Sequence, residues 1–140
     1  MVLDLSPLSK AVHLLEEAVA NACDQNFIDS LTASQNKLII SGVIQNFKFT
    51  YELCWKFIKR RLTENLGKTH VDGVTRRELF RLAATHKLIK SVEEWMLFHQ
   101  ARNQTSHTYD EDIAKEVFET AQQFVQHSKD LLSVLSNKND

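Results

Sequence analysis

The 140-residue sequence contains few of the residues that interrupt regular structure. It has three glycines and one proline, and the proline stands at position 7. Glycine and proline mark turns, so long segments without them favour helices over a fold of many short strands. We therefore expect an all-α protein. The two cysteines, Cys23 and Cys54, form no CxxC pair and belong to no Cys/His cluster with zinc spacing, so we expect no metal site.

The sequence also lacks targeting and membrane signals. No stretch approaches the roughly 20 apolar residues that a membrane-spanning helix requires. The N-terminus has neither the basic start nor the apolar run of a signal peptide, and two unpaired cysteines suit a reducing compartment. We expect a cytoplasmic protein with no membrane segment. No Gly-rich phosphate loop is present, so the sequence suggests no cofactor.

The net charge of −1 conceals an uneven distribution of charge. Residues 56–90 contain ten lysines or arginines and three acids, a net charge of +7, so the remainder of the chain carries −8. A basic segment of this kind suits nucleic acid or an acidic protein partner. A solvated helix end followed by a connector explains it equally well. Charge alone leaves both interpretations open.

Apolar residues recur at helical spacing along most of the chain. Between residues 8 and 22 they follow one another at alternating intervals of four and three, which is typical of one buried stripe on a helix. Helix caps are indicated at Ser6-Pro7, at Thr75 with Glu78, at Ser91 with Glu94, and at Asp110. We expect helices over residues 6–26 and 30–66, a loop over residues 68–74, and three helices that begin after Thr75, Ser91 and Asp110. Residues 136–140 are expected to fray.

These segments predict a single domain, residues 1–140, folded as an antiparallel bundle of about five helices around a four-helix up-and-down core. The second helix is apolar over much of its circumference, because Tyr51 and Trp55 widen a stripe that already contains Val43, Phe47 and Cys54. A helix of this kind must be covered on several sides. We therefore expect a homodimer with this helix at or near the interface.

Reactive side chains gather at Arg102 and His107, where the apolar periodicity weakens. On a continuous helix five residues turn about 500°, which leaves the two side chains roughly 140° apart. They converge if the helix unwinds near Ser106 or if a second subunit supplies one of them. Arginine binds phosphate as a permanent cation with a forked set of donors, and histidine exchanges protons near neutral pH. The pair suits RNA cleavage, in which the 2′-OH is the nucleophile and no metal is needed, with Asn103 in support.

The spacing of these two residues also occurs by chance in many helical proteins, and most histidines on a surface have no catalytic role. A more specific pattern is Arg102-x4-His107-x-Tyr109. It resembles the Arg-x4–6-His signature of the HEPN superfamily, in the version that ends His-x-Tyr. Residues 42–56 (GVIQNFKFTYELCWK) resemble the long second helix of HEPN proteins labelled nucleotidyltransferase substrate-binding, which are encoded beside minimal nucleotidyltransferases.

The resemblance covers nearly the whole chain. The Arg76-Arg77-Glu78 stretch, Trp95 and residues 105–111 follow in the order that this family leads one to expect. The chain departs from the family pattern at Lys48, where an acid is expected, and before Arg77, where a Ser-Pro pair usually stands. These departures concern the second helix and the connector, and they leave the Arg/His/Tyr set intact.

The resemblance implies a helical dimer in which two Arg/His sets face one cleft, and a toxin that cleaves RNA without metal through Arg102 and His107. It also implies a partner, a minimal nucleotidyltransferase that acts as antitoxin by transferring AMP from ATP to Tyr109. A different role for Tyr109 stays open, in which the ring packs and its hydroxyl caps the last helix. The functional alternative is a non-catalytic subunit that presents substrate to a two-component nucleotidyltransferase. The Arg/His pair favours the ribonuclease, since docking alone does not require it.

Overall fold

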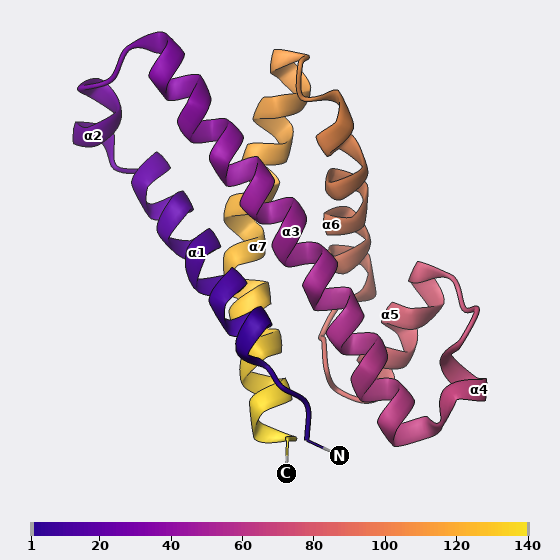
Figure 1. Cartoon of the computed structure of the whole chain (residues 1–140). Helices are drawn as coiled ribbons and strands as arrows, with labels where there is room; N and C mark the ends of the chain where they lie inside the picture. Colours follow the sequence, from indigo (N-terminus) through magenta and orange to yellow (C-terminus); the bar gives the residue numbers. More distant parts are fainter. Residues whose placement is uncertain (1, 140) are drawn as a thin grey trace.

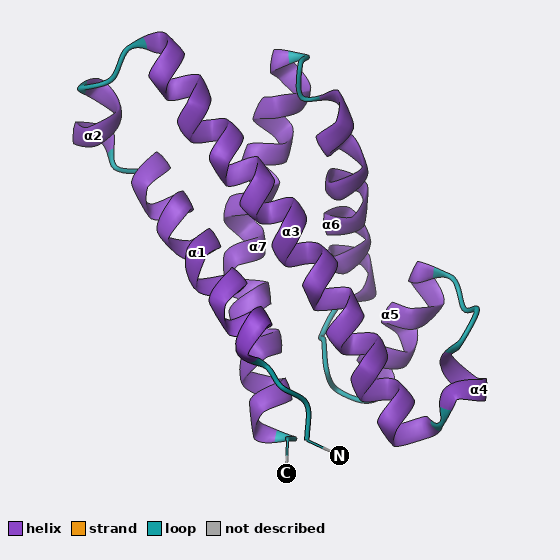
Figure 2. Cartoon of the chain, viewed as in Figure 1, coloured by secondary structure: helices purple, strands orange, loops and turns teal. Residues whose placement is uncertain are grey.

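The computed structural model describes residues 2–139 and consists of helices joined by short connections (Figure 1). The helices are α1 (Ser6–Ala22), α2 (Gln25–Asp29), α3 (Ala33–Leu66), α4 (Lys68–Val71), α5 (Arg76–Thr85), α6 (Val92–Gln104) and α7 (Glu111–Asn137), with a 3₁₀ turn, η1 (Thr105–His107), between the last two. No strand occurs between residues 2 and 139 (Figure 2). The all-α prediction is therefore confirmed.

Helices α1, α3, α6 and α7 run alternately in opposite directions and form the body of the molecule (Figure 1). α3 lies at the centre, because it packs against α1, α7 and α6. The short helices α4 and α5 lie beyond the C-terminal half of α3, and α5 also packs against α6. This arrangement places the C-terminal half of α3, the start of α5 and the length of α6 side by side.

Polar side chains cap most of these helices as the sequence predicts. Backbone N–H groups in the first turns of α5, α6 and α7 donate to the side chains of Thr75, Ser91 and Asp110, respectively. α3 ends at Gly67, whose φ of +90° lies in the region that favours glycine. The residues at which the last three predicted helices begin are thus set by local sequence.

Three predicted boundaries near the start of the chain were wrong. Ser6 is the first helical residue of α1 and not its cap, because the Asp4 carboxylate accepts from the Ser6 N–H instead. α1 ends at Ala22, and Asp24 caps the separate short helix α2. The long helix then begins after Thr32, which forms a reciprocal capping box with Gln35. Weak cap signals that follow one another closely cannot be ranked without the tertiary structure.

The segment 68–74 and the end of the chain also differ from the prediction. Residues 68–71 form the one-turn helix α4 rather than a loop. α7 continues to Asn137, and the Asn139 side chain accepts from the Leu3 N–H and from Arg61 Nη2, both at 2.8 Å. These contacts tie the C-terminus to the N-terminus and to α3, so fraying at 136–139 was the wrong expectation; residue 140 lies outside the described residues.

The core beneath α6 is aromatic. Phe124 of α7 contacts Phe47 of α3 edge-to-face, with ring centroids 5.2 Å apart, and Trp95 and Phe98 of α6 at 5.5 and 4.9 Å. Tyr51 lies beside this group at 6.2 Å from Phe124. Such edge-to-face pairs add to the stability that comes from burying the rings. Because the four rings are closely packed, α6 has a defined position over α3.

Within residues 2–139, no helix combines the length and the apolar composition that crossing a lipid bilayer would need.

Candidate functional site

The backbone changes its geometry just after Arg102. α6 ends at Gln104, and the N–H and hydroxyl of Thr105 both donate to the Arg102 carbonyl, the hydroxyl at 2.7 Å. Residues 105–107 then form the 3₁₀ turn η1. A 3₁₀ turn has fewer residues per turn than an α-helix, so Arg102 and His107 do not keep α-helical spacing. The helix thus unwinds near Ser106, which was one of the two conditions for the convergence of Arg102 and His107.

Arg102 forms an ion pair with Glu52 of α3. Its Nε donates to Glu52 Oε1 at 2.6 Å, and the two side chains retain 26% and 30% of their exposure. Glu52 Oε2 accepts from Trp55 Nε1 at 3.0 Å, so both carboxylate oxygens are occupied. Between residues 2 and 139, no other hydrogen bond from the Arg102 side chain is found. One edge of the guanidinium is therefore fixed, and its two terminal nitrogens remain available to a phosphate.

The charges around Glu52 keep it ionised. Partial burial raises the pKa of the carboxyl, but hydrogen bonds from Arg102 and Trp55, together with the charges of Arg102 and Arg76, outweigh burial and lower the pKa below its usual value. A carboxylate that stays ionised at neutral pH holds the arginine in place over the whole physiological range.

Tyr51 and His99 form a second contact between α3 and α6. The Tyr51 hydroxyl lies 2.9 Å from His99 Nδ1. Burial raises the pKa of the Tyr51 phenol, which therefore stays protonated and shares a hydrogen bond with the His99 ring. Burial, with the charges of Arg76 and Arg102, lowers the pKa of His99 although Glu52 opposes this. A pKa below the usual value favours the neutral form of His99 at pH 7.

Trp55 also contacts the first residue of α5, next to the Arg102–Glu52 pair. The guanidinium carbon of Arg76, the first residue of α5, lies 3.6 Å from the centre of the Trp55 ring. This is a close cation–π contact. Residues from three helices therefore meet here, and we call them the Arg102 cluster: Tyr51, Glu52, Trp55, Arg76, His99 and Arg102.

His107 and Tyr109 lie apart from this cluster in the isolated chain. Both are exposed, and their rings contact each other with centroids 6.3 Å apart. Asn103 is also exposed. Among the contacts of residues 2–139, no hydrogen bond or ion pair joins Arg102 to His107. The structure places all four predicted site residues at one end of α6 and pairs Arg102 with Glu52, not with His107.

Tyr109 is one of the most exposed side chains of the protein, at 85%. The hydroxyl of Tyr109 does not cap α7, because the side chain of Asp110 accepts from the first N–H groups of that helix. The packed, capping role that the sequence left open for Tyr109 is therefore wrong. The exposed phenol is accessible to a reagent or to a partner protein.

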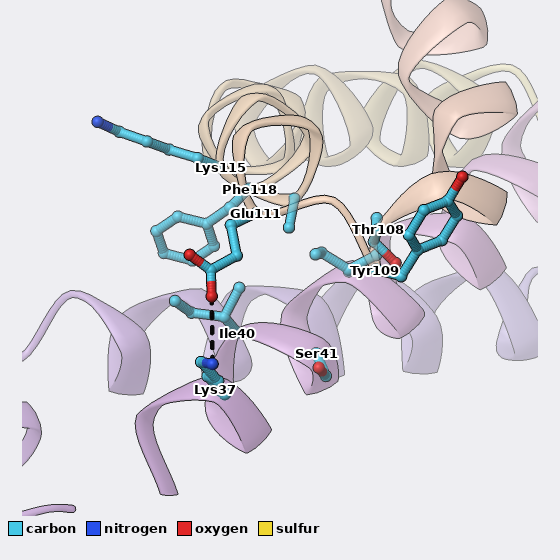
Figure 3. Close-up of a pocket in the computed structure, with 10 residues that line it drawn as sticks. Lys37, Ile40, Ser41, Thr108, Tyr109, Glu111, Lys115 and Phe118 are labelled. Carbon is cyan, nitrogen blue, oxygen red and sulfur yellow. Dashed lines mark ion pairs between the residues drawn. The ribbon is translucent and has the colours of Figure 1, made fainter. Parts of the chain in front are cut away.

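Tyr109 stands at one end of an open hollow between α3 and α7, with a volume of about 580 Å³. Figure 3 shows its hydroxyl directed away from the Lys37–Glu111 ion pair, which lies at the other end at 3.2 Å. Ile40 and Phe118 supply apolar lining beside the Lys37–Glu111 pair. The phenol is thus accessible from solvent, and its hydroxyl points away from the hollow.

Among residues 2–139, no group of three or more histidines, cysteines or acids is arranged to hold a metal ion. This end of α6 presents guanidinium, imidazole and phenol groups from Arg102, His107 and Tyr109.

Sequence reasoning missed Glu52, Tyr51 and Arg76 as members of this site. A signal for Glu52 was present, since it is the one acid between residues 41 and 61, in the middle of a long helix that buries several apolar residues. Tyr51 was assigned to the core, where it does lie, but its hydroxyl reaches His99. No local pattern shows that Arg76 crosses to Trp55, because more than 20 positions separate them.

Comparison with known proteins identifies several relatives. Residues 3–137 match the protein family described as nucleotidyltransferase substrate binding protein like. The chain is 33% identical over 138 residues to a Haemophilus influenzae protein named Probable ribonuclease HepT, an alignment that covers 98% of this chain and 94% of that protein.

Two solved structures share the fold. One, from Haemophilus influenzae, is described as revealing the fold of a substrate binding domain of a nucleotidyltransferase; it has a TM-score of 0.91 and 31% identity, over 95% of this chain and 99% of that one. The other, a protein from Thermus thermophilus, has a TM-score of 0.71 and 23% identity, over 91% of this chain and 98% of that one. The second likeness concerns the fold alone.

Proposed function

Because this chain belongs to the nucleotidyltransferase substrate-binding family of HEPN proteins, we propose that it is the toxin subunit of a two-gene toxin–antitoxin pair. In this proposal it is a metal-independent endoribonuclease, and a partner minimal nucleotidyltransferase silences it by attaching AMP to Tyr109. The observation that carries the proposal is the state of Arg102. Glu52 fixes one edge of its guanidinium and leaves the other edge open, just before the turn that carries an exposed histidine.

The reaction needs three events at one phosphodiester. The 2′-OH of the ribose loses its proton and attacks the adjacent phosphorus. The 5′-oxygen of the next nucleotide leaves with a proton, and the products are a 2′,3′-cyclic phosphate and a 5′-OH. His107 accepts the proton of the 2′-OH and delivers it to the leaving 5′-oxygen. Arg102 stabilises the negative charge that builds up on the phosphate oxygens. Neither role requires a metal.

The first test is cleavage of single-stranded RNA by the purified protein in EDTA. We expect products that end in a 2′,3′-cyclic phosphate, detected by mass spectrometry of the fragments. Chelation is expected to leave the rate unchanged, because the nucleophile is supplied by the RNA itself. Linear 3′-hydroxyl ends, or activity that returns only with a divalent ion, would contradict the proposal.

Because Arg102 and His107 make no direct contact within one chain, the proposal includes a homodimer in which a second copy completes the cleft. The exposed apolar residues Leu38 and Phe49, at 72% and 58%, both lie on α3. They are 11 positions apart, so on an α-helix their side chains point in directions about 20° apart around the helix axis. Glu52 follows Phe49 by three positions, close to the same side of the helix. A dimer through this face of α3 would bring two Arg102 clusters together.

We predict that sedimentation equilibrium at micromolar concentration will show a dimer, and that Phe49→Ser will weaken it by roughly tenfold or more, since buried aromatic residues dominate many interfaces. Phe27→Ser is the matched control, because Phe27 is an exposed phenylalanine on α2, at 37%. A monomeric parent, or equal weakening by both substitutions, would remove the dimer through this face.

The second candidate is a non-catalytic subunit that presents substrate to a nucleotidyltransferase. The observation in its favour is the likeness to the Haemophilus influenzae structure that is described as such a domain. The two candidates differ in what they require. A docking subunit tolerates the loss of Arg102 and His107, whereas a ribonuclease does not.

A further inference from the structure

Arg76 and Arg102 are held by two side chains, Trp55 and Glu52, that hydrogen-bond to each other. Trp55 supports Arg76 with its ring face, at 3.6 Å from the guanidinium carbon, and donates its indole N–H to Glu52. Glu52 in turn accepts from Arg102. Two cations that belong to different helices, α5 and α6, are thereby positioned over one stretch of α3. The charges of both arginines lower the pKa of His99, so both lie near that ring.

The Arg102 cluster carries a net positive charge. Glu52 is the only acid in the Arg102 cluster and it pairs with Arg102, while the lowered pKa of His99 favours its neutral form. Arg76 forms no ion pair among residues 2–139. Its charge and a side-chain hydrogen bond act on the Tyr51 phenol, and its Nη1 is buried without an acceptor within hydrogen-bond distance. A buried donor without an acceptor costs free energy that an anion would offset. The neighbouring Arg77 differs, because it pairs with Glu93 on the surface.

A basic surface continues from Trp55 toward the end of α3. A hollow of about 420 Å³ begins at Trp55 and includes Lys56, Lys59 and Arg60 in its lining. Glu64 also lines the hollow, and Asp72 lies 3.8 Å from Lys59, so these two acids offset part of the positive charge. Trp55 is half-buried, and arginine and lysine side chains next to a partly accessible aromatic ring form the kind of surface that binds single-stranded nucleic acid. The basic segment that charge alone left unexplained therefore includes a continuation of the Arg102 cluster.

We propose that Arg76 is a second RNA-binding arginine, which binds the sugar–phosphate backbone next to the phosphate held by Arg102. This inference rests on the proposed ribonuclease function and adds a binding residue to it. The guanidinium is planar and carries forked donors, so it binds a phosphodiester while its face stays stacked on Trp55. The strand then continues along Lys56 and Arg60 at the C-terminal end of α3.

The test measures RNA binding rather than cleavage. His107→Ala provides a background in which the RNA stays intact, and Arg76→Gln and Arg77→Gln are introduced into it separately. The two substitutions remove the same charge from adjacent positions, but only Arg76 lies on Trp55. The probe is a short fluorescent single-stranded oligoribonucleotide of mixed sequence, and its Kd is followed by anisotropy as the salt concentration is varied.

We expect Arg76→Gln to raise the Kd by roughly tenfold, as for a charged hydrogen bond. Its plot of log K against log salt is expected to flatten by about 0.7, the value for one phosphate contact on a single strand. Arg77→Gln is expected to match the background in both respects. Arg76→Lys keeps the charge and loses the forked donors, so it should retain most of the salt slope but bind RNA more weakly. This variant also keeps the test valid if Arg76→Gln folds poorly.

The outcomes separate this inference from the function on which it rests. A background protein that does not bind RNA would overturn both. RNA binding that depends on Arg102 but responds equally to Arg76→Gln and Arg77→Gln would overturn the role of Arg76 alone. Weaker binding with an unchanged salt slope would show that Arg76 only supports Trp55. Loss of binding to the partner transferase, with RNA binding intact, would reassign Arg76 to an acidic protein surface.

Discussion

Arg102→Ala and His107→Ala are each expected to reduce RNA cleavage by a factor of about 10² or more, because charge stabilisation and proton transfer are separate requirements of the reaction. The measurement is the initial rate of cleavage of a single-stranded RNA in EDTA. Matched controls are Arg81→Ala and His13→Ala, which remove an arginine on the surface of α5 and a histidine on the surface of α1. Both controls are expected to cleave at the parent rate.

Arg102→Ala has a structural side effect that must be separated from catalysis. It leaves Glu52 as a partly buried carboxylate without its ion pair, which costs stability. Arg102→Lys keeps a positive charge near Glu52 but loses the forked donors, so we expect it to retain most of the stability and little of the activity. Melting temperatures identify loss of fold. Unchanged cleavage in the Arg102/His107 double variant would point to a contaminating nuclease and end the assignment.

The Tyr109→Phe variant is expected to take up no AMP when it is incubated with the partner nucleotidyltransferase, ATP and Mg²⁺. In the parent protein the phenol oxygen attacks the α-phosphorus of ATP, pyrophosphate leaves, and the phenol proton passes to solvent or to a base of the transferase. The chain has two tyrosines, and the other, Tyr51, is fully buried. An AMP mass on the parent protein should therefore map to the peptide that contains Tyr109.

The modification is also expected to stop RNA cleavage. AMP on Tyr109 adds a phosphodiester with one negative charge, two residues after His107 and on a ring that contacts its imidazole. That phosphodiester resembles the RNA backbone and competes for the same cations. Labelled parent protein should lose most of its cleavage, whereas Tyr109→Phe should stay active in the presence of the transferase. Full activity of the labelled protein, or normal labelling of the variant, would favour the substrate-binding alternative.

The sequence alone determined the fold class and most of the later helix boundaries. Few glycines and prolines, long apolar periodicity and strong local caps at Thr75, Ser91 and Asp110 act over a few residues, so they can be read without a structure. The same locality explains the errors. Whether Ser6 caps α1 or lies inside it, and whether α3 begins after Ser30 or after Thr32, depends on side-chain contacts between near-equivalent candidates.

The sequence also predicted which end of α6 carries the reactive groups, because Arg102, His107 and Tyr109 lie within eight consecutive residues. It could not predict what surrounds them. Glu52 reaches Arg102 across 50 positions, Tyr51 reaches His99 across 48, and Arg76 reaches Trp55 from another helix. Those contacts exist because the aromatic core holds α3 and α6 together and α5 packs against both. Local sequence thus decided the helices and the motif, and tertiary packing alone decided which charges meet there.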